Sequence, residues 1–405
     1  MGQHITANLR SVALVGHGAA GKTTLAETLL ATTGTITSRG AIEKGNTVCD
    51  FDPQEKELRH SINSAIVGFN WLDYHIHLVD TPGFPDFAGQ AIGALAAVDT
   101  AVIVINAQNG IELNTERMMK AAAARKLCRM IVINKIDADN VDLPKLLANI
   151  RDRFGHECMP LNLPTKNGQD VINALDHADG ESDFESVAEA HRAIIDQIVE
   201  EDEDLLAKYL EDGEDPAPEA LIAPFAKALC DGHLIPILFA SAKTGVGIRQ
   251  LLDVLGKLAP NPYEGNPPPF YKGAPGSADA VPFDAVPDAG KHVLAHVFKV
   301  VSDPFIGKLG VFRVHQGTIK KDSQLFVGDA KRSFKVGHLF RLLGKEYIEV
   351  SELIPGDIGA IAKIEEIEFD CVLHDLKGEV SIHLQPLEFP QPMQGLAVTA
   401  KKKAD

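Results

Sequence analysis

The chain contains 405 residues, of which 45% are hydrophobic and 23% charged, values that are ordinary for globular proteins and indicate two or three domains. Its net charge of −17 disfavours nucleic acid as a partner of the whole chain, but residues 176–219 hold 17 acidic and 2 basic side chains, so the acidity belongs to one segment. The five cysteines are scattered, and no hydrophobic run is long enough to span a bilayer. These features predict a cytoplasmic protein without a disulfide framework, a structural metal or a membrane partner.

The first informative stretch is a strand-like run, Ser11–Val15, followed by G-x-x-x-x-G-K-T and a predicted helix, Lys22–Thr32. Glycines permit a tight turn there, and the N–H groups at the start of a helix face a bound phosphate. Lys22 would reach the β- and γ-phosphates, and the Thr23 hydroxyl would ligate Mg²⁺. A glycine-containing turn without a ligand is the alternative. The predicted phosphate-binding residues are His17, Gly18, Ala19, Ala20, Gly21, Lys22, Thr23 and Thr24.

Strand-like and helix-like segments alternate up to about residue 154, which predicts an α/β fold with a mostly parallel sheet and helices on both faces. Residues 33–59 are polar and too numerous for a simple connector, so we expect a functional loop there. The predicted strands are Ser11–Val15, Ile62–Phe69, His75–Val79, Ala101–Asn106 and Met130–Asn134, and the predicted helices are Lys22–Thr32, Phe87–Val98, Asn114–Arg125 and Leu143–Phe154.

A second motif, D-T-P-G at residues 80–83, follows the third of these strands. The strand delivers Asp80 to the carboxyl edge of the sheet, where its carboxylate can hold Mg²⁺ through a water molecule. Gly83 can then place its backbone N–H against a γ-phosphate, an arrangement that distinguishes a triphosphate from a diphosphate. An ordinary strand-end turn is the alternative, but the nearby phosphate loop favours the metal site.

A third motif, N-K-I-D at residues 134–137, points to guanine. The Asp137 carboxylate can accept from N1–H and from the 2-amino group of guanine, a pair of donors that adenine lacks. Lys135 would lie along the base, and Ala242 would donate its backbone N–H to the guanine oxygen. The predicted base-reading residues are Asn134, Lys135, Asp137, Ser241, Ala242 and Lys243. Together the motifs predict binding of GTP or GDP with Mg²⁺ and phosphoryl chemistry.

The remaining chain divides by composition. Residues 182–210 indicate an acidic amphipathic helix, with a break allowed, inside an insertion at about 158–234. A linker rich in Pro, Gly and Ala follows at 263–289, and residues 387–405 resemble the start of a further domain. Short β-type segments separated by turns such as Asp303-Pro304 predict a small antiparallel β-barrel over 290–386. Before the linker, a predicted strand at Ile235–Ala240 and a closing helix at Ile248–Leu258 complete the α/β fold. The β-type segments after the linker are His292–Val301, Gly310–His315, Gln324–Val327, Phe334–Leu342 and Ile358–Ile364.

The order of these motifs, with an insertion and then a barrel, resembles the translational GTPases, and among them elongation factor G and its paralogues. Asp50–Ala65 is similar to the family's first switch, Ser302–Phe305 and Phe312–Val314 to its barrel, and Pro386–Pro390 to the entry of its third domain. The resemblance implies a GTP-binding domain at 1–262 that hydrolyses GTP to GDP and phosphate. It also implies that the family's later domains are missing from this chain.

Departures from the family pattern concern hydrolysis. Phe84 stands where the family has a His that orients the attacking water, and a phenyl ring cannot hydrogen-bond water. Ala19 replaces an Asp linked to a monovalent cation, whereas Ser61 aligns with the Mg²⁺-ligating Thr and supplies an equivalent hydroxyl. These differences indicate a paralogue that binds nucleotide but hydrolyses it weakly. The predicted catalytic positions are Gly83, Phe84 and Lys22. His17 and His60 are candidates to replace the missing His. The alternative for His17 is packing within its loop, and the alternative for His60 is a solvated side chain.

By resemblance, the partner is the ribosome, through its RNA and its stalk protein, and the chain is a monomer away from it. The acidic run Glu200–Asp204 either docks the stalk protein or is a solvated helix face. A ribosome-associated GTPase acting in translocation or a related step is the leading hypothesis. A nucleotide-gated ribosome-binding regulator with little or no GTPase activity is the alternative, and a metallocentre chaperone is disfavoured because no His- or Cys-rich segment is present. Candidate contacts to ribosomal RNA phosphates, or merely solvated turns, are Lys320, Lys321, Lys331, Arg332 and Lys335.

Overall fold

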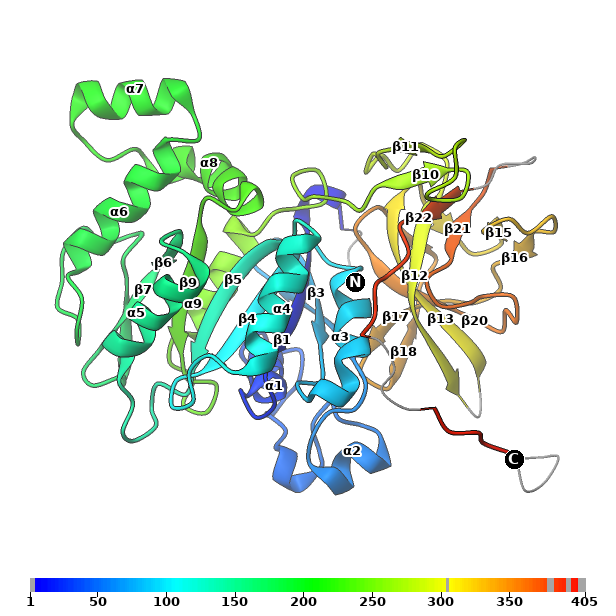
Figure 1. The fold of residues 1–405 in the computed structure, drawn as a ribbon, viewed down its shortest axis with the longest axis horizontal. Helices are drawn as coiled ribbons and strands as arrows, with labels where there is room; N and C mark the ends of the chain where they lie inside the picture. The colour runs from blue at the N-terminus through cyan, green and yellow to red at the C-terminus, as the bar shows by residue number, and fades with distance from the viewer. Residues whose placement is uncertain (1–3, 304–305, 377–381, 391–394, 400–405) are drawn as a thin grey trace.

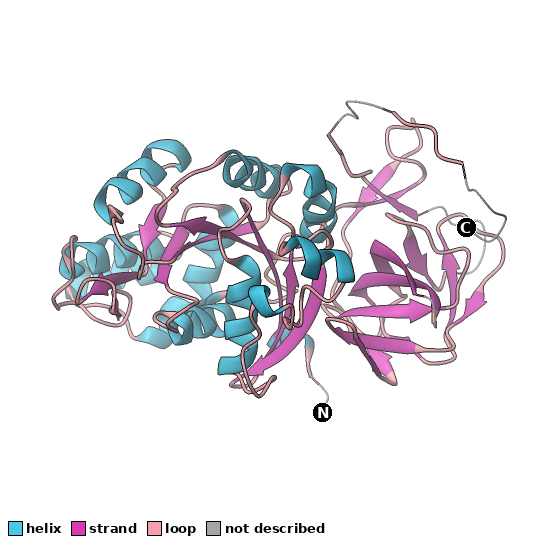
Figure 2. Ribbon diagram, turned by 90° about the horizontal axis from the view of Figure 1, so that it is seen from below, coloured by secondary structure: helices cyan, strands magenta, loops and turns pink. Residues whose placement is uncertain are grey.

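The computed structural model describes residues 4–303, 306–376, 382–390 and 395–399, and the structural statements below concern these residues. Two parts lie side by side, an α/β part built on one seven-stranded sheet and a C-terminal part built of strands (Figure 1). Colouring by secondary structure separates them clearly, because the helices gather around the first sheet (Figure 2). The predicted fold class, an α/β part with a mostly parallel sheet followed by an antiparallel β-barrel, is confirmed. Within the described part of the chain, no helix is both long and apolar enough to cross a membrane.

The large sheet has the strand order β2-β3-β1-β4-β5-β9-β6, in which only β2 and β3 run antiparallel. Strands β1, β4 and β9 are buried at every position, as expected for continuous apolar runs in a parallel sheet covered on both faces. The strands are β1 (Leu9–Gly16), β2 (Ala65–Trp71), β3 (Tyr74–Asp80), β4 (Thr100–Asn106), β5 (Cys128–Asn134), β6 (Cys158–Pro160) and β9 (Ile235–Ala240), beside the hairpin β7 (Asn162–Thr165) and β8 (Asp170–Asn173).

The helices follow the expected alternation, and two of them begin and end at the predicted residues. Gly21 precedes the first of these, and the Asp142 carboxylate caps the second by accepting from Lys145 N–H at 3.1 Å. The helices are α1 (Lys22–Thr32), α2 (Pro53–Leu58), α3 (Ala88–Leu95), α4 (Leu113–Ala124), α5 (Leu143–Phe154), α6 (Val187–Val199), α7 (Glu203–Asp212), α8 (Pro218–Asp231) and α9 (Ile248–Asp253), the last continued by a π-helical turn at Val254–Leu258.

Two segments carry more structure than the sequence indicated. The predicted loop at 33–59 contains α2, which Asp52 and Glu55 start with a capping box. The acidic segment 182–210 is two helices, α6 and α7, because Asp202 caps the start of the second by accepting from Leu205 N–H at 2.9 Å. In Figure 1, α6 and α7 lie at the end of the molecule farthest from the barrel.

The C-terminal part contains an eight-stranded antiparallel sheet with the order β16-β15-β21-β12-β13-β20-β17-β18, and β14 pairs with β19. The single strand predicted at Phe334–Leu342 is wrong, since two strands occupy it. The turn at Asp303-Pro304 and the match at Ser302–Phe305 extend outside the described residues. The strands are β12 (Leu294–Asp303), β13 (Gly307–Gln316), β14 (Ile319–Lys320), β15 (Gln324–Val327), β16 (Phe334–Lys335), β17 (Leu339–Leu343), β18 (Glu346–Glu349), β19 (Glu352–Leu353), β20 (Ile358–Ala362) and β21 (Val372–His374).

The predicted linker is partly ordered into a sheet of its own. Strands β10 (Phe270–Lys272), β11 (Val281–Phe283) and β22 (Ile382–Leu384) form a three-stranded antiparallel sheet, with Phe270 buried at its centre. A strand that follows the eight-stranded sheet in the sequence thus pairs with the linker, a long-range contact that local composition does not encode. The domain limits expected from the sequence, and a further domain starting at 387, stay predictions; residues 391–394 and 400–405 lie outside the described residues.

Buried polar contacts join the two parts. Asp99, which precedes β4, accepts from Arg313 of β13 at 2.6 Å and from Ser11 at 2.8 Å, and the ion pair is nearly inaccessible to solvent. A second contact involves β3, where Asp357 contacts His77 of β3 at 3.0 Å and Arg341 of β17 at 3.0 Å. A third contact is a hydrogen bond from the Lys299 ammonium to the carbonyl of Ser64, just before β2. These contacts tie the barrel to the α/β sheet.

Candidate functional site

The loop between β1 and α1 needs glycine at two positions. At Gly16 the φ angle is +139°, and a Cβ atom would lie 2.4 Å from the carbonyl oxygen of Val104. At Gly21 the φ angle is +93°, and a Cβ atom would lie 2.4 Å from the amide nitrogen of Asn134. Both constraints come from β4 and β5, which follow β1 in the sheet order, so glycine lets the backbone turn closely over the sheet edge. The loop borders a cavity of about 1030 Å³.

Lys22 and Thr23, the first residues of α1, face this cavity. The Lys22 ammonium donates to the carbonyls of His17 at 2.7 Å and Gly16 at 3.2 Å. Burial lowers the pKa of Lys22, and the nearby Asp80 carboxylate opposes that shift. Thr23 donates its hydroxyl proton to Asp80 at 2.7 Å, and its oxygen lies 3.1 Å from the Ser61 hydroxyl. The three residues predicted to hold a metal are therefore in contact with one another.

Two buried carboxylates meet beside these hydroxyls. Asp80 is 1% exposed, and its Oδ1 atom has no hydrogen-bond partner among the described residues. Asp50, which is 3% exposed, lies nearby. Burial is the larger cause that raises the pKa of Asp80, and the negative charge of Asp50 is the second. Burial raises the pKa of Asp50 to about 6. Two carboxylates held close together in a low-dielectric site are costly unless a cation accompanies them. The sequence reasoning assigned no role to Asp50, whose only signal was its place at the start of the switch-like segment.

Gly83 and Phe84 lie against the loop. A Cβ atom at Gly83 would be 2.3 Å from the Lys22 ammonium and 2.6 Å from the backbone nitrogen of Gly18, so only glycine allows this approach. The Phe84 ring covers Gly18, where a Cβ atom would be 3.2 Å from the ring, and its centroid is 4.6 Å from that of His60. Both rings border the cavity, and Phe84 is 37% exposed. The aromatic ring therefore occupies space beside the phosphate loop.

His17 points away from the cavity, toward the start of α4. Its Nδ1 atom accepts from the backbone N–H of Asn114 at 3.4 Å, and its Nε2 atom is 3.5 Å from Glu112. Asn114, which the sequence reasoning missed, also donates to the carbonyl of Gly83 at 2.6 Å and is 2% exposed. An isolated asparagine at the start of a helix carries no signal for such a role.

Asn134 connects three of the predicted loops. Its amide nitrogen donates to the carbonyl of Ala20 at 2.9 Å, and its oxygen accepts from the backbone N–H of Ala242 at 3.0 Å and of Lys135 at 2.9 Å. The side chain is 1% exposed, so these hydrogen bonds are shielded from water. Lys135 adds a second link by donating to the carbonyl of Ala19 at 2.8 Å.

Asp137 stands at the open end of the same cavity. It accepts from the Ser241 hydroxyl at 2.6 Å, and the Lys243 ammonium is 3.8 Å from its other oxygen. Arg39, another residue missed by the sequence reasoning, donates to the carbonyl of Ala242 and, at 2.9 Å, to that of Lys243. One pocket thus collects the ends of β1, β3, β5 and β9, four strands whose carboxyl ends share an edge.

Two family models match the chain, the Elongation factor Tu GTP binding domain over residues 7–261 and Elongation factor G domain 2 over residues 292–369. The chain belongs to the translational GTPases. Similar curated proteins of this family include an "Elongation factor G-like protein" from each of two strains of Mycobacterium tuberculosis, CDC 1551 / Oshkosh and ATCC 25618 / H37Rv. Each is 33% identical over 430 aligned positions, covering 98% of this chain and 59% of the relative.

A crystal structure of a protein from Thermus thermophilus has a TM-score of 0.78 and 31% identity to this translational GTPase. The alignment covers 92% of this chain and 55% of that one. The chain therefore spans less than two thirds of the length of these relatives. The match to Elongation factor G domain 2 and the elongation factor G-like relatives confirm the resemblance to elongation factor G that the order of the motifs predicted.

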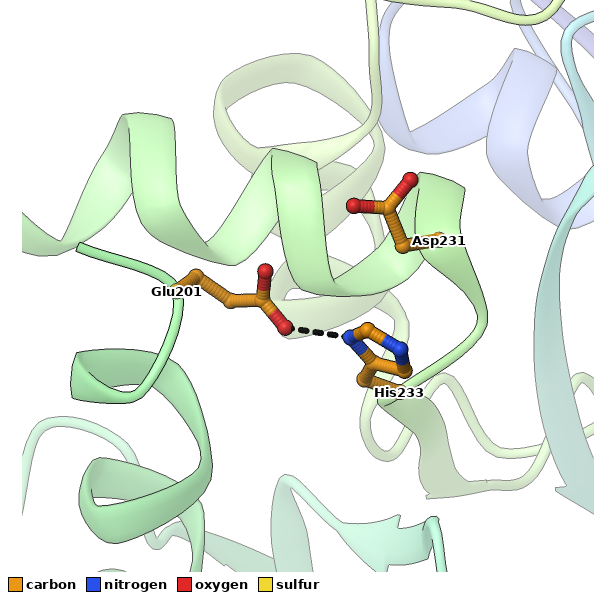
Figure 3. Close-up of side chains that lie close together, drawn as sticks. All are labelled: Glu201, Asp231 and His233. Carbon is orange, nitrogen blue, oxygen red and sulfur yellow. Dashed lines mark hydrogen bonds and ion pairs between the residues drawn. The ribbon is translucent and has the colours of Figure 1, made fainter.

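The residues predicted to meet the ribosome are partly engaged within the chain. Glu201, in the acidic run, is only 6% exposed at its side chain and accepts from Lys227 at 3.0 Å and from His233 at 2.5 Å. Figure 3 shows Glu201 and His233 facing each other, with Asp231 nearby. Because Lys227 of α8 already neutralises Glu201, this cluster is an ion-paired contact between the α6–α7 turn and the C-terminal part of α8. In the barrel, Lys320, Lys321 and Lys335 pair with Glu352, Glu349 and Asp322 at 3.5, 3.3 and 2.8 Å.

Proposed function

We propose that this translational GTPase binds GTP and GDP with Mg²⁺ and changes conformation with the presence of the γ-phosphate. The observation that supports this most directly is the convergence of the phosphate loop, D-T-P-G, N-K-I-D and S-A-K on one cavity at the carboxyl edge of the sheet. Lys22 and the backbone N–H groups of 18–24 would hold the phosphates. Asn134, Lys135, Asp137 and Ala242 would read the guanine base.

The residues around Asp80 fit a divalent cation. The Oδ1 atom of Asp80, buried and without a hydrogen-bond partner among the described residues, and the hydroxyls of Thr23 and Ser61 form an oxygen-rich donor set of the kind that Mg²⁺ prefers. The raised pKa values of Asp80 and Asp50 show that negative charge is costly there, and a bound cation would offset that cost. In the proposal Thr23 and Ser61 ligate the ion, and Asp80 positions it through water. The bound ion would neutralise charge on the β- and γ-phosphates.

Hydrolysis would be weak in the isolated chain. Gly83 lies where its N–H can approach a γ-phosphate, but Phe84 offers neither a donor nor an acceptor to the attacking water. The His60 ring packs against Phe84, with the two ring centroids 4.6 Å apart. In the proposal, a group on the ribosome or the His60 ring completes the site, and translocation or a related ribosomal step uses the resulting switch.

The second candidate function is a nucleotide-gated ribosome-binding regulator with little or no GTPase activity. The placement of Phe84 over the phosphate loop favours it, because an apolar ring excludes water from the place that an attacking water needs. Under either proposal the ribosome, through its RNA and stalk protein, is the partner, the chain is monomeric away from it, and the location is the cytoplasm. These parts of the proposal rest on the family relationship.

Nucleotide binding is tested by calorimetry on the 405-residue chain with GDP, GTP and ATP, each with Mg²⁺ and with a chelator. We expect GDP and GTP to bind and ATP not to bind, and the chelator to weaken GTP binding. Comparable affinity for ATP would contradict the role of Asp137. Absence of GDP binding would contradict the whole assignment.

GTP turnover with and without ribosomes distinguishes the two functions. A large gain in ribosome-stimulated turnover on Phe84→His would indicate a switch impaired at that position, whereas little change would indicate that another group already orients the water. Phe369→His is a matched control, because Phe369 has a similar exposure of 42% and lies outside the cavity. No stimulation in wild type or variant would favour the regulator.

A further inference from the structure

Two of the five cysteines lie side by side although 102 positions separate them in the sequence. Cys128 is the first residue of β5, and Cys230 is the penultimate residue of α8. Their sulfur atoms are 2.6 Å apart. Cys128 is fully buried, whereas Cys230 is only partly covered. No part of the nucleotide chemistry uses either thiol.

The backbone on both sides of this pair is held in place. The N–H of Cys128 donates to the carbonyl of Asp99 at 3.1 Å. The Asn266 side chain donates to the carbonyl of Cys230 at 3.0 Å and to that of Lys126 at 2.7 Å, so one amide group clamps the two segments together. The proximity of the thiols therefore follows from the packing of α8 against β5, and neither element has to move for the sulfur atoms to meet.

We propose that Cys128 and Cys230 are a peroxide-sensitive thiol pair that forms a reversible intramolecular disulfide. The partly exposed Cys230 gives up its thiol proton, and its sulfur attacks one oxygen of hydrogen peroxide. The O–O bond breaks, which leaves a sulfenic acid and a hydroxide ion that takes up that proton to form the first water. The Cys128 sulfur then attacks the Cys230 sulfur, the S–O bond breaks, and the leaving hydroxyl takes the Cys128 thiol proton to form the second water. In sum, two thiols and one peroxide give one disulfide and two waters. A dithiol reductant reverses the reaction.

The order of events follows from the two environments. The contact with Cys230, and then burial, raise the pKa of Cys128, so its thiol stays protonated and reacts poorly with peroxide by itself. Cys128 therefore acts second, on the oxidised sulfur already beside it. The scattered cysteines of the sequence predicted no structural disulfide, and a transient one in a reducing compartment is consistent with that prediction.

The disulfide would fix α8 to β5. Helices α6 and α8 pack together, so the cross-link would hold the acidic segment in one position relative to the sheet. The nucleotide-contacting end of β5 is about 20 Å from Cys128 at the usual rise per residue. Binding of GDP is therefore expected to change by less than about twofold. A cross-link that closes so long a loop should raise the thermal unfolding midpoint by about 5 °C or more.

The test exposes the full chain to hydrogen peroxide, traps free thiols with N-ethylmaleimide and maps the tryptic peptides without reduction. We expect residues 127–129 linked to residues 228–243, the rise in unfolding midpoint, and reversal of both by dithiothreitol. Cys230→Ser should abolish the link and the rise, whereas Cys158→Ser, at a buried cysteine elsewhere in the fold, should keep both. Cys128 and Cys230 still free after treatment, Cys230 oxidised to sulfinic acid, or a link from either residue to a different cysteine would each overturn the proposal.

Discussion

Asn134→Ala removes the side chain that joins the phosphate loop, the base-reading loop and the S-A-K loop. The substitution leaves the N–H groups of Ala242 and Lys135 and the carbonyl of Ala20 without their partner in a site that is 1% exposed. Each lost hydrogen bond is worth about 1 kcal/mol net. The three together give about 3 kcal/mol, which corresponds to about a 100-fold change in an equilibrium constant.

This loss is divided between the free energy of unfolding and the affinity for nucleotide, because the same hydrogen bonds stabilise the free protein and pre-organise its loops. Fluorescence titration with a labelled GDP measures the affinity, and urea unfolding measures the stability. The two losses should sum to about 3 kcal/mol. The control is Asn109→Ala, at an exposed asparagine in the loop between β4 and α4, which should change neither the affinity nor the stability measurably. If Asn134→Ala left both unchanged, the role assigned to this side chain would be refuted.

Three further predictions concern other contacts. Arg313→Met leaves the Asp99 carboxylate buried without its partner and should lower the unfolding free energy by about 3–5 kcal/mol in urea. Burial lowers the pKa of His315, so on acidification through about pH 6.5 the unfolded chain takes up this proton before the folded chain does, and the free energy of unfolding falls. In urea unfolding, His315→Leu should therefore lose about 1 kcal/mol less stability than wild type between about pH 7.5 and about pH 5.5. Gly83→Ala pushes a methyl group against Lys22 and should weaken GTP binding about tenfold by calorimetry; an unchanged affinity would contradict the close approach.

Local patterns were sufficient for the elements that carry the nucleotide loops. The strand–glycine loop–helix order around Gly21 encodes its own geometry, because positive φ and a helix start are properties of a few adjacent residues. Helix α5 was predictable for the same reason, since Asp142 caps it locally. Alternation of apolar strands with helices was enough to predict a parallel sheet, and therefore that the motifs following β1, β3, β5 and β9 share an edge.

Contacts between distant segments depended on the tertiary structure. Asp50 lies close enough to raise the pKa of Asp80, Arg39 donates to the S-A-K loop, and Asn114 donates to the carbonyl of Gly83, only because distant parts of the chain fold together. The pairing of β22 with the linker and the contact of Cys128 with Cys230 have the same origin. Burial and long-range proximity set the pKa values and hydrogen bonds of these groups, and neither is encoded in a short stretch of sequence. The sequence by itself determined which loops are predicted to bind nucleotide, because each motif is local; the tertiary structure decided which additional side chains surround these loops.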